Sequence, residues 1–191
     1  MSYLLETIKI EDGQVYNLSY HQARCDKSRA TLFGTKEKLD LSSIIEAPKK
    51  GLFRCRIVYD KKLHKVEYIP YKAKEIASLT IVHSDLLYNH KYANRDALNS
   101  LLNLHKETDD ILIIKNGYIT DTSIANIAFF DGKQWITPKT PLLEGTMRAK
   151  LLDECFLIVK DIKKASLKHY SHVALMNAMI GFKVLNQITY K

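Results

Sequence analysis

A proline-rich stretch before a predicted helix has the composition of an anion-binding loop. It runs Thr137-Pro-Lys-Thr-Pro-Leu-Leu-Glu-Gly-Thr-Met-Arg148, with two prolines that fix the approach and Gly145 that permits close passage of the backbone. A helix is expected from Thr146, so its unpaired amides would face an anion with the positive end of the helix dipole behind them. An ordinary proline-rich loop that precedes a helix is the alternative interpretation.

Two further segments each carry one group that could do chemistry. Asp121 follows the predicted Asn116-Gly117 turn and lies among small polar residues, where a carboxylate could keep a pyridine nitrogen protonated. A solvated turn aspartate, or one that caps local amides, fits the same pattern. Lys91 is expected at a strand-to-helix junction, where desolvation can make an amine reactive, although nothing in the neighbouring residues singles it out.

Several common catalytic motifs are absent from the sequence. It contains no Gly-x-Gly-x-x-Gly, P-loop, His-Glu-x-x-His or Gly-x-Ser-x-Gly pattern, which argues against dinucleotide, nucleoside triphosphate, zinc-protease and serine-hydrolase chemistry. The remaining groups suit a phosphorylated aldehyde cofactor. Such a cofactor needs an amine to condense with it, a carboxylate opposite its ring nitrogen, and a cradle for its phosphate.

The elements that would position these groups form an α+β pattern. Alternation and turn residues predict strands at 4–10, 15–18, 52–59, 63–69, 78–83, 110–115, 118–120, 124–131, 134–137 and 157–159. Helical spacing predicts helices from an N-cap at Ser19 to Gly34, at 92–105 and at 146–155, and a short helix or a loop near 39–45. The stretch 166–190 mixes a helical turn with strand-like runs. We expect two small lobes, at residues 1–72 and 73–191, connected near Pro70-Tyr71-Lys72.

Composition limits the class of protein and of partner. The 191 residues are 46% hydrophobic and 26% charged, as in ordinary globular proteins, and no run is apolar enough for a membrane span. The net charge of +8 comes mainly from lysines scattered in small groups, so we expect no nucleic-acid partner. Three widely spaced cysteines predict neither disulfides nor a metal site. The first residues lack the pattern of a secretory signal, so we expect a cytoplasmic protein.

Together, these segments resemble the class IV aminotransferase and 4-amino-4-deoxychorismate lyase family, over residues from about Leu4 to Val184. Leu5-Glu-Thr-Ile-Lys is similar to the family's Phe-Glu-Thr-Ile opening, and Tyr20-His-Gln-Ala-Arg-Cys-Asp-Lys-Ser28 is similar to its His-x-x-Arg-x-x-x-Ser segment. Lys91 with Asn94 resembles its lysine-x-x-Asn pattern. Gly145-Thr-Met-Arg148 resembles its Gly-Ile-Thr-Arg loop, and Asp121 with Asn126 resembles its acidic motif.

The resemblance implies a fold, a cofactor and a set of site residues. The fold would be that of D-amino-acid aminotransferase, with pyridoxal 5'-phosphate held in the cleft between two lobes, and the protein would be a homodimer that acts on a small amino substrate. Lys91 would be the catalytic Schiff-base lysine. The implied cofactor contacts are Arg24 and the amides of Thr146 and Met147 with the phosphate, Asp121 with the pyridine nitrogen, Ile124 and Leu143 with the ring, and Asn177 and Ala178 in a second phosphate turn.

Within the family, two reactions remain open. Lys91-Tyr-Ala-Asn-Arg95 and Asn177-Ala-Met resemble the lyase pattern, which implies release of pyruvate from 4-amino-4-deoxychorismate to give p-aminobenzoate. Arg95 would bind a substrate carboxylate, or would form an ordinary ion pair on the helix surface. Transamination of branched-chain or D-amino acids is the alternative, and a catalytically silent binding protein is a third possibility.

Two departures from the family pattern affect these expectations. Asp121 is one methylene shorter than the family's usual Glu, so it must come closer to the ring nitrogen or contact it less well. The first lobe is expected to be abbreviated, without the hairpin that usually precedes the opening motif. That would remove part of the wall on the substrate side.

Overall fold

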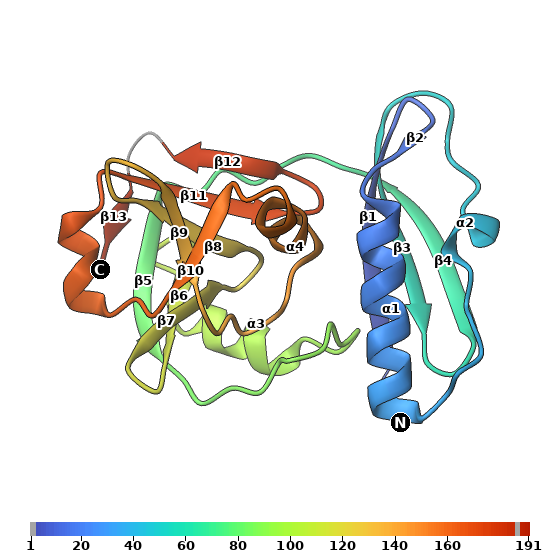
Figure 1. Ribbon diagram of the computed structural model, residues 1–191, viewed down its shortest axis with the longest axis horizontal. Coiled ribbons are helices and arrows are strands. Elements are labelled where there is room, and N and C mark those ends of the chain that lie inside the picture. The colour runs from blue at the N-terminus through green and yellow to red at the C-terminus, as the bar shows by residue number, and fades with distance from the viewer. Residues whose placement is uncertain (1–2, 186–187) are drawn as a thin grey trace. The chain divides into compact units, whose positions relative to one another are not determined.

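The computed structural model describes residues 3–185 and 188–191, and the chain divides into two compact units (Figure 1). Unit 1 comprises Met1–Ala73 and His90–Asn94, and unit 2 comprises Lys74–Asn89 and Arg95–Lys191. Strands and a smaller number of helices occur in both units, which confirms the α+β class. None of the helices in the described part of the chain has the length and apolar character that a membrane crossing requires.

Within the described residues of unit 1, four strands form an antiparallel sheet in the order β2-β1-β3-β4. The strands are β1 (Leu4–Glu11), β2 (Gln14–Val15), β3 (Leu52–Tyr59) and β4 (Leu63–Pro70). Asp12 and Gly13, with φ of 47° and 84°, form the turn between β1 and β2, as the Asp-Gly pair predicted. β3 has the predicted bounds, and its partly buried and buried residues alternate from Arg54 to Tyr59.

Helix α1 (Leu18–Phe33) packs against this sheet, and the short helix α2 (Leu41–Ile44) follows it. The predicted N-cap at Ser19 was wrong, because α1 begins at Leu18 and Asn17 is the cap residue, with φ of 54°. Gly34 ends the helix in the left-handed conformation, as predicted. The shared core contains the buried side chains of Leu4, Ile8, Ile10, Cys25, Leu41, Cys55, Ile57 and Tyr59.

The segment His90–Asn94 lies between two stretches of unit 2 along the chain but packs with unit 1. Tyr92 forms an isolated antiparallel bridge with Leu4, and the Ala93 amide donates to the Tyr3 carbonyl at 2.9 Å. The predicted helix at 92–105 was therefore too long at its start. Helix α3 occupies Asp96–Asn103, because Tyr92 bridges to β1 and the Ala93 amide bonds to Tyr3 instead.

Within the described residues of unit 2, nine strands form one sheet. Its main path is β10-β9-β8-β7-β6-β5-β13, and β11 pairs with both β8 and β12. The strands are β5 (Ser78–His83), β6 (Asp110–Lys115), β7 (Tyr118–Thr122), β8 (Asn126–Phe130), β9 (Trp135–Pro138), β10 (Leu157–Lys160), β11 (His172–Asn177), β12 (Gly181–Leu185) and β13 (Thr189–Tyr190).

The helices of unit 2 are short. Besides α3, they are α4 (Thr146–Asp153), which starts at the predicted residue, and a 3₁₀ turn, η1 (Lys164–His169). The expected helical turn and strand-like runs of 166–190 correspond to η1, β11, β12 and β13, and positions 186–187 lie outside the described residues. The core of unit 2 centres on buried side chains of β6, β8 and β11, among them Leu112, Ile127, Phe129 and Leu175.

Candidate functional site

A buried carboxylate lies on the face of β1 that forms the core of unit 1. Leu4, Glu6, Ile8 and Ile10 alternate along the strand, and all four are 0% exposed. The pleat directs residues two apart to the same face, so Glu6 occupies a position that packing would otherwise give to an aliphatic residue. An unpaired carboxylate there would cost several kcal/mol, so Glu6 needs partners.

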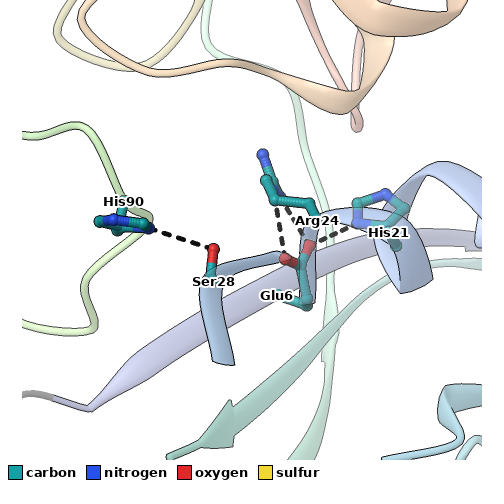
Figure 2. A network of polar contacts seen from close by, with 5 residues as sticks. All are labelled: Glu6, His21, Arg24, Ser28 and His90. Carbon is teal, nitrogen blue, oxygen red and sulfur yellow. Dashed lines mark hydrogen bonds and ion pairs between the residues drawn. The ribbon is translucent and has the colours of Figure 1, made fainter. Parts of the chain in front are cut away.

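Arg24 and His21 supply those partners (Figure 2). The Arg24 Nε donates to Glu6 Oε1 at 2.9 Å, and Arg24 Nη2 donates to Oε2 at 2.6 Å. The His21 Nδ1 lies 2.6 Å from the same Oε2. Burial by itself would raise the pKa of Glu6, but the charge of Arg24 and the hydrogen bond with His21 outweigh it and lower the pKa to about 2. Glu6 is therefore an anion at neutral pH.

The spacing of α1 places its functional side chains on one face. His21, Arg24 and Ser28 are three and four residues apart, the separations that lie on one side of a helix. His21 is 0% exposed, and burial lowers its pKa, although its hydrogen bond with Glu6 opposes the shift. His21 is thus neutral at pH 7, with the proton on Nδ1 that the anionic Glu6 accepts.

The segment that carries Lys91 lies beside β1. The Leu5 amide donates to the Lys91 carbonyl at 2.9 Å, so the backbone of Lys91 is adjacent to the strand that bears Glu6. The neighbouring His90 contacts Ser28 of α1, with 3.2 Å between Nδ1 and Oγ (Figure 2). The charge of Lys91 also contributes to lowering the pKa of His21. Unit 1 therefore gathers Lys91, Arg24 and the two histidines around β1 and α1.

Unit 2 holds the second buried acid, Asp121 of β7. The Asn126 Nδ2 donates to Asp121 Oδ1 at 2.7 Å, and the Leu143 amide donates to Oδ2 at 2.8 Å. Burial raises the pKa of Asp121 to about 6, against the opposing effect of these hydrogen bonds and of the Arg148 charge. Asp121 is the shorter acid expected from the sequence, and two amide donors fix its position.

The predicted anion loop leads directly into α4. Gly145 precedes the helix with φ of −75°, and Thr146 is 4% exposed. The Arg148 Nη2 donates to the Pro138 carbonyl at 2.9 Å, while its buried Nε has no hydrogen-bond partner among the described residues. Burial lowers the pKa of Arg148, and the charge of Asp121 opposes that shift.

Other predicted residues meet at the turn between β7 and β8. Arg95 Nη2 donates to the Ser123 carbonyl at 2.8 Å, a contact that the sequence did not indicate. The Asn177 Nδ2 donates to the Ile124 carbonyl at 3.2 Å, and its Oδ1 accepts from the amides of Met179 and Ile180. Ile124 itself is 43% exposed. The turn at residues 121–126 is thus the point where Arg95, Leu143 and Asn177 converge.

The predicted site residues are divided between the two units. Lys91 and Arg24 belong to unit 1. Unit 2 carries Arg95, Asp121, Ile124, Leu143, Thr146, Met147, Asn177 and Ala178. Met147 and Ala178 are partly buried.

Sequence reasoning assigned no role to Glu6, His21, Ser28, His90 or Arg148. A signal existed for Glu6, because a charged residue in phase with Leu4, Ile8 and Ile10 breaks the apolar face of a predicted strand. No local pattern could have indicated His90, since its contact with Ser28 joins residues that are 62 positions apart.

Known proteins share this fold and much of this sequence. A solved structure from Haemophilus somnus 129pt, named as a candidate 4-amino-4-deoxychorismate lyase, is 41% identical with a TM-score of 0.85, covering 95% of this chain and 98% of the other. A Haemophilus influenzae protein without a functional name is 36% identical over 184 residues, which are 93% of this chain and 98% of that protein. A candidate aminodeoxychorismate lyase of Schizosaccharomyces pombe is 32% identical over 143 residues, 70% of this chain and 61% of the relative.

The model of one protein family matches almost the whole sequence. It is described as amino-transferase class IV, and it covers residues 3–186. The chain therefore belongs to the class IV aminotransferase family, a family of pyridoxal-phosphate-dependent enzymes.

Proposed function

We propose that the chain is a pyridoxal-phosphate-dependent lyase that converts 4-amino-4-deoxychorismate to p-aminobenzoate and pyruvate. The observation that carries the proposal is the 41% identity, over 98% of its length, to the Haemophilus somnus protein named as a candidate for this activity. The Schizosaccharomyces pombe relative has a similar name. The run from Lys91 to Arg95, with Asn94 within it, adds the resemblance of the sequence itself to the lyase pattern.

The residues of the chain fit the proposed cofactor. Asp121 is a buried acid with a pKa of about 6, so it is mostly ionised at neutral pH and can hold a proton on a pyridine nitrogen. Asn126 and the Leu143 amide keep its carboxylate in place. In the proposed site, the first turn of α4 would bind the phosphate through the amides of Thr146 and Met147, and Arg24 would bind it through its guanidinium.

The remaining contacts follow from the same assignment. Ile124 and Leu143 would pack on the ring, and the turn at Asn177 and Ala178 would contribute a second phosphate contact. Asn177 already forms a turn with the amides of Met179 and Ile180, which keeps this backbone fixed.

The chain's own groups would then perform the chemistry. When bound, pyridoxal phosphate supplies an aldehyde that condenses with amines and a ring that withdraws electrons. Lys91 would hold the cofactor through its amine and, once that amine is free, would take the proton from the substrate carbon that bears the nitrogen. Lys91 or a water returns a proton to the leaving enolpyruvyl group. Arg95 would orient a substrate carboxylate from the turn at Ser123.

The two family reactions differ in what they require. A transaminase stops after one turnover unless a 2-oxo acid accepts the amino group, whereas the lyase needs no acceptor. We expect purified protein loaded with pyridoxal phosphate to release pyruvate and p-aminobenzoate from 4-amino-4-deoxychorismate over many turnovers without any 2-oxo acid. Lys91→Met is the matched control and should release neither product.

Two other results would overturn the lyase proposal. Amino-group exchange between an L- or D-amino acid and 2-oxoglutarate, without pyruvate from aminodeoxychorismate, would make the protein a transaminase. Cofactor binding without either reaction would make it a silent member of the family.

We also propose that the protein is a homodimer in the cytoplasm, as the resemblance implies. Sedimentation at the assay concentration tests the oligomeric state. An active monomer would contradict the first part of this proposal.

A further inference from the structure

The Glu6 carboxylate has no part in the chemistry proposed above, yet it occupies one of the most enclosed positions in unit 1. Its strand neighbours on the same face are Leu4, Ile8 and Ile10, and all of them are 0% exposed. Replacing a buried ion pair with apolar residues of similar volume is often neutral or stabilising. Packing alone therefore gives no reason for a carboxylate here.

We infer that Glu6 is a positioning residue, which clamps one edge of Arg24 and holds His21 as its neutral Nδ1–H form, so that Arg24 presents a fixed edge to the cofactor phosphate. The inference rests on the proposed function, because it takes Arg24 as the phosphate ligand. Glu6 itself would touch neither cofactor nor substrate.

The geometry of the ion pair supports a clamp. Glu6 accepts from Nε and from Nη2 of Arg24, at 2.9 and 2.6 Å, which is the bidentate side-on arrangement of a guanidinium and a carboxylate. A guanidinium has five N–H groups, of which this contact uses two. Two bonds to one planar partner fix both the position and the plane of Arg24, so a phosphate meets donors that are already oriented.

His21 completes the arrangement from the other side. Its Nδ1 lies 2.6 Å from the Oε2 that also accepts from Arg24 Nη2, so this oxygen is held by donors from two side chains. His21 lies one helical turn before Arg24 on α1, and it is completely buried. Glu6 on the strand is thereby bonded to two successive turns of the helix, and its carboxylate cannot rotate without losing a bond.

Glu6 balances the charge of Arg24 before a phosphate binds. Neutral His21 adds no charge, so the charges of Glu6 and Arg24 sum to zero in the absence of a ligand. The positive charge of Lys91, on the adjacent segment, helps to lower the pKa of His21. Glu6 thus helps to keep the partly buried guanidinium of Arg24 in place before the phosphate arrives. Without Glu6, the guanidinium would lose the two hydrogen bonds that fix its Nε edge.

Glu6→Gln tests the inference, because it keeps the shape of the side chain but removes the charge and one acceptor. We expect affinity for pyridoxal phosphate to fall roughly ten- to a hundredfold, as for loss of a charge-assisted hydrogen bond. Affinity for pyridoxal, which has no phosphate, should stay the same. Inorganic phosphate should also compete less well with pyridoxal phosphate.

Glu67→Gln is the matched control. Glu67 forms an ion pair with Arg56 on the same sheet, so this exchange removes the same kind of charge and should leave both affinities unchanged.

Arg24→Lys separates failure of this inference from failure of the proposed site. If Arg24→Lys lowers the preference for pyridoxal phosphate over pyridoxal and Glu6→Gln does not, Arg24 binds phosphate and the positioning role is wrong. If neither variant changes that preference, the phosphate assignment of Arg24 is wrong as well. An equal loss for both ligands in Glu6→Gln would mean general loosening and would also overturn the role.

One measurement on the unaltered protein does not depend on whether a variant folds. Nitrogen-15 spectra of the histidine side chains should show His21 neutral at pH 7, with its proton on Nδ1, in the apoprotein and in the loaded protein. A protonated Nε2, or a doubly protonated ring, would contradict the clamp.

Discussion

Gly145 and Asn126 lie so close that a Cβ added to Gly145 would come within 2.0 Å of Asn126 Oδ1. The φ of Gly145 is −75°, a value that any residue can adopt. Glycine is therefore required by the position of one neighbouring side chain and not by the backbone conformation.

Gly145→Ala should displace Asn126, because its amide is the obstacle. Asn126 Nδ2 donates to Asp121 Oδ1 and to the Leu143 carbonyl, so its movement would remove one hydrogen bond to the buried acid and one to the loop before α4. We expect a loss of unfolding free energy of about 1–3 kcal/mol, as for overpacking. Affinity for pyridoxal phosphate should fall about tenfold, as for the loss of one hydrogen bond.

The double variant Gly145→Ala, Asn126→Ala isolates the cause. Removing the amide makes room for the new methyl group, so it should recover part of the stability while cofactor affinity stays low. Urea unfolding and cofactor titration measure the two effects. Wild-type affinity in the double variant would show that Asn126 does not support Asp121.

The stability of the apoprotein should depend on Glu6 in acid. The pKa of Glu6 is about 2 in the folded chain, compared with its usual value of 4.5. The stability that ionised Glu6 gives to the fold is therefore fully present above pH 4.5 and is lost as the pH falls through about 2. The shift corresponds to about 3 kcal/mol. The difference in unfolding free energy between wild type and Glu6→Gln should therefore shrink by about this amount from pH 5 to pH 2. Parallel curves would show that Glu6 is not an anion of lowered pKa.

Asp121 should make the apoprotein less stable as the pH rises, which is opposite to the effect of Glu6 and occurs at higher pH. Burial raises its pKa from 3.8 to about 6, so the folded chain keeps a proton that the unfolded chain releases. The associated stabilisation of about 3 kcal/mol is complete below pH 3.8 and is lost as the pH rises to about 6. Asp121→Asn should remove this decline. Urea unfolding of both apoproteins between pH 4 and pH 7 measures this loss of stability. An equal loss in the variant would show that another group causes it.

Reductive labelling should identify Lys91 as the reactive amine. Borohydride treatment of the protein with pyridoxal phosphate should fix the cofactor to the peptide that contains Lys91, because only an unprotonated amine at the site condenses with the aldehyde. Lys91→Met should abolish the label, whereas Lys133→Met, at an exposed position of a turn, should keep it. A label on another lysine would refute the assignment.

The sequence predicted the strands of this fold better than the boundaries of its helices. β3, β5 and β6 have the expected bounds, because alternation and flanking turn residues are local properties. Helix α3 starts four residues after the expected start, because Tyr92 bridges to Leu4 from 88 positions earlier in the chain. Tertiary pairing of this kind overrides local helical spacing and leaves no mark in a window of neighbouring residues.

For the candidate site, the sequence indicated residues but not the groups around them. Motif similarity indicated Arg24, Lys91 and Asp121, and the structure adds the groups that hold them. Asn126 was assigned only as the end of a motif, whereas its amide joins Asp121 to the loop before α4. Such partners depend on which strand packs on which helix, and this is not encoded at a fixed spacing.

The pairing of residues 90–94 with unit 1 has a consequence for biosynthesis. Leu5 and Tyr3 are bonded to residues that leave the ribosome long after Ala73, so the edge of β1 stays open while the first part of unit 2 is made. A chain that ends at Ala73 would expose this edge permanently, and unpaired strand edges promote aggregation. The segment that carries Lys91 is therefore also the last part of unit 1 to be synthesised. Unit 1 cannot complete its fold until this segment has been made.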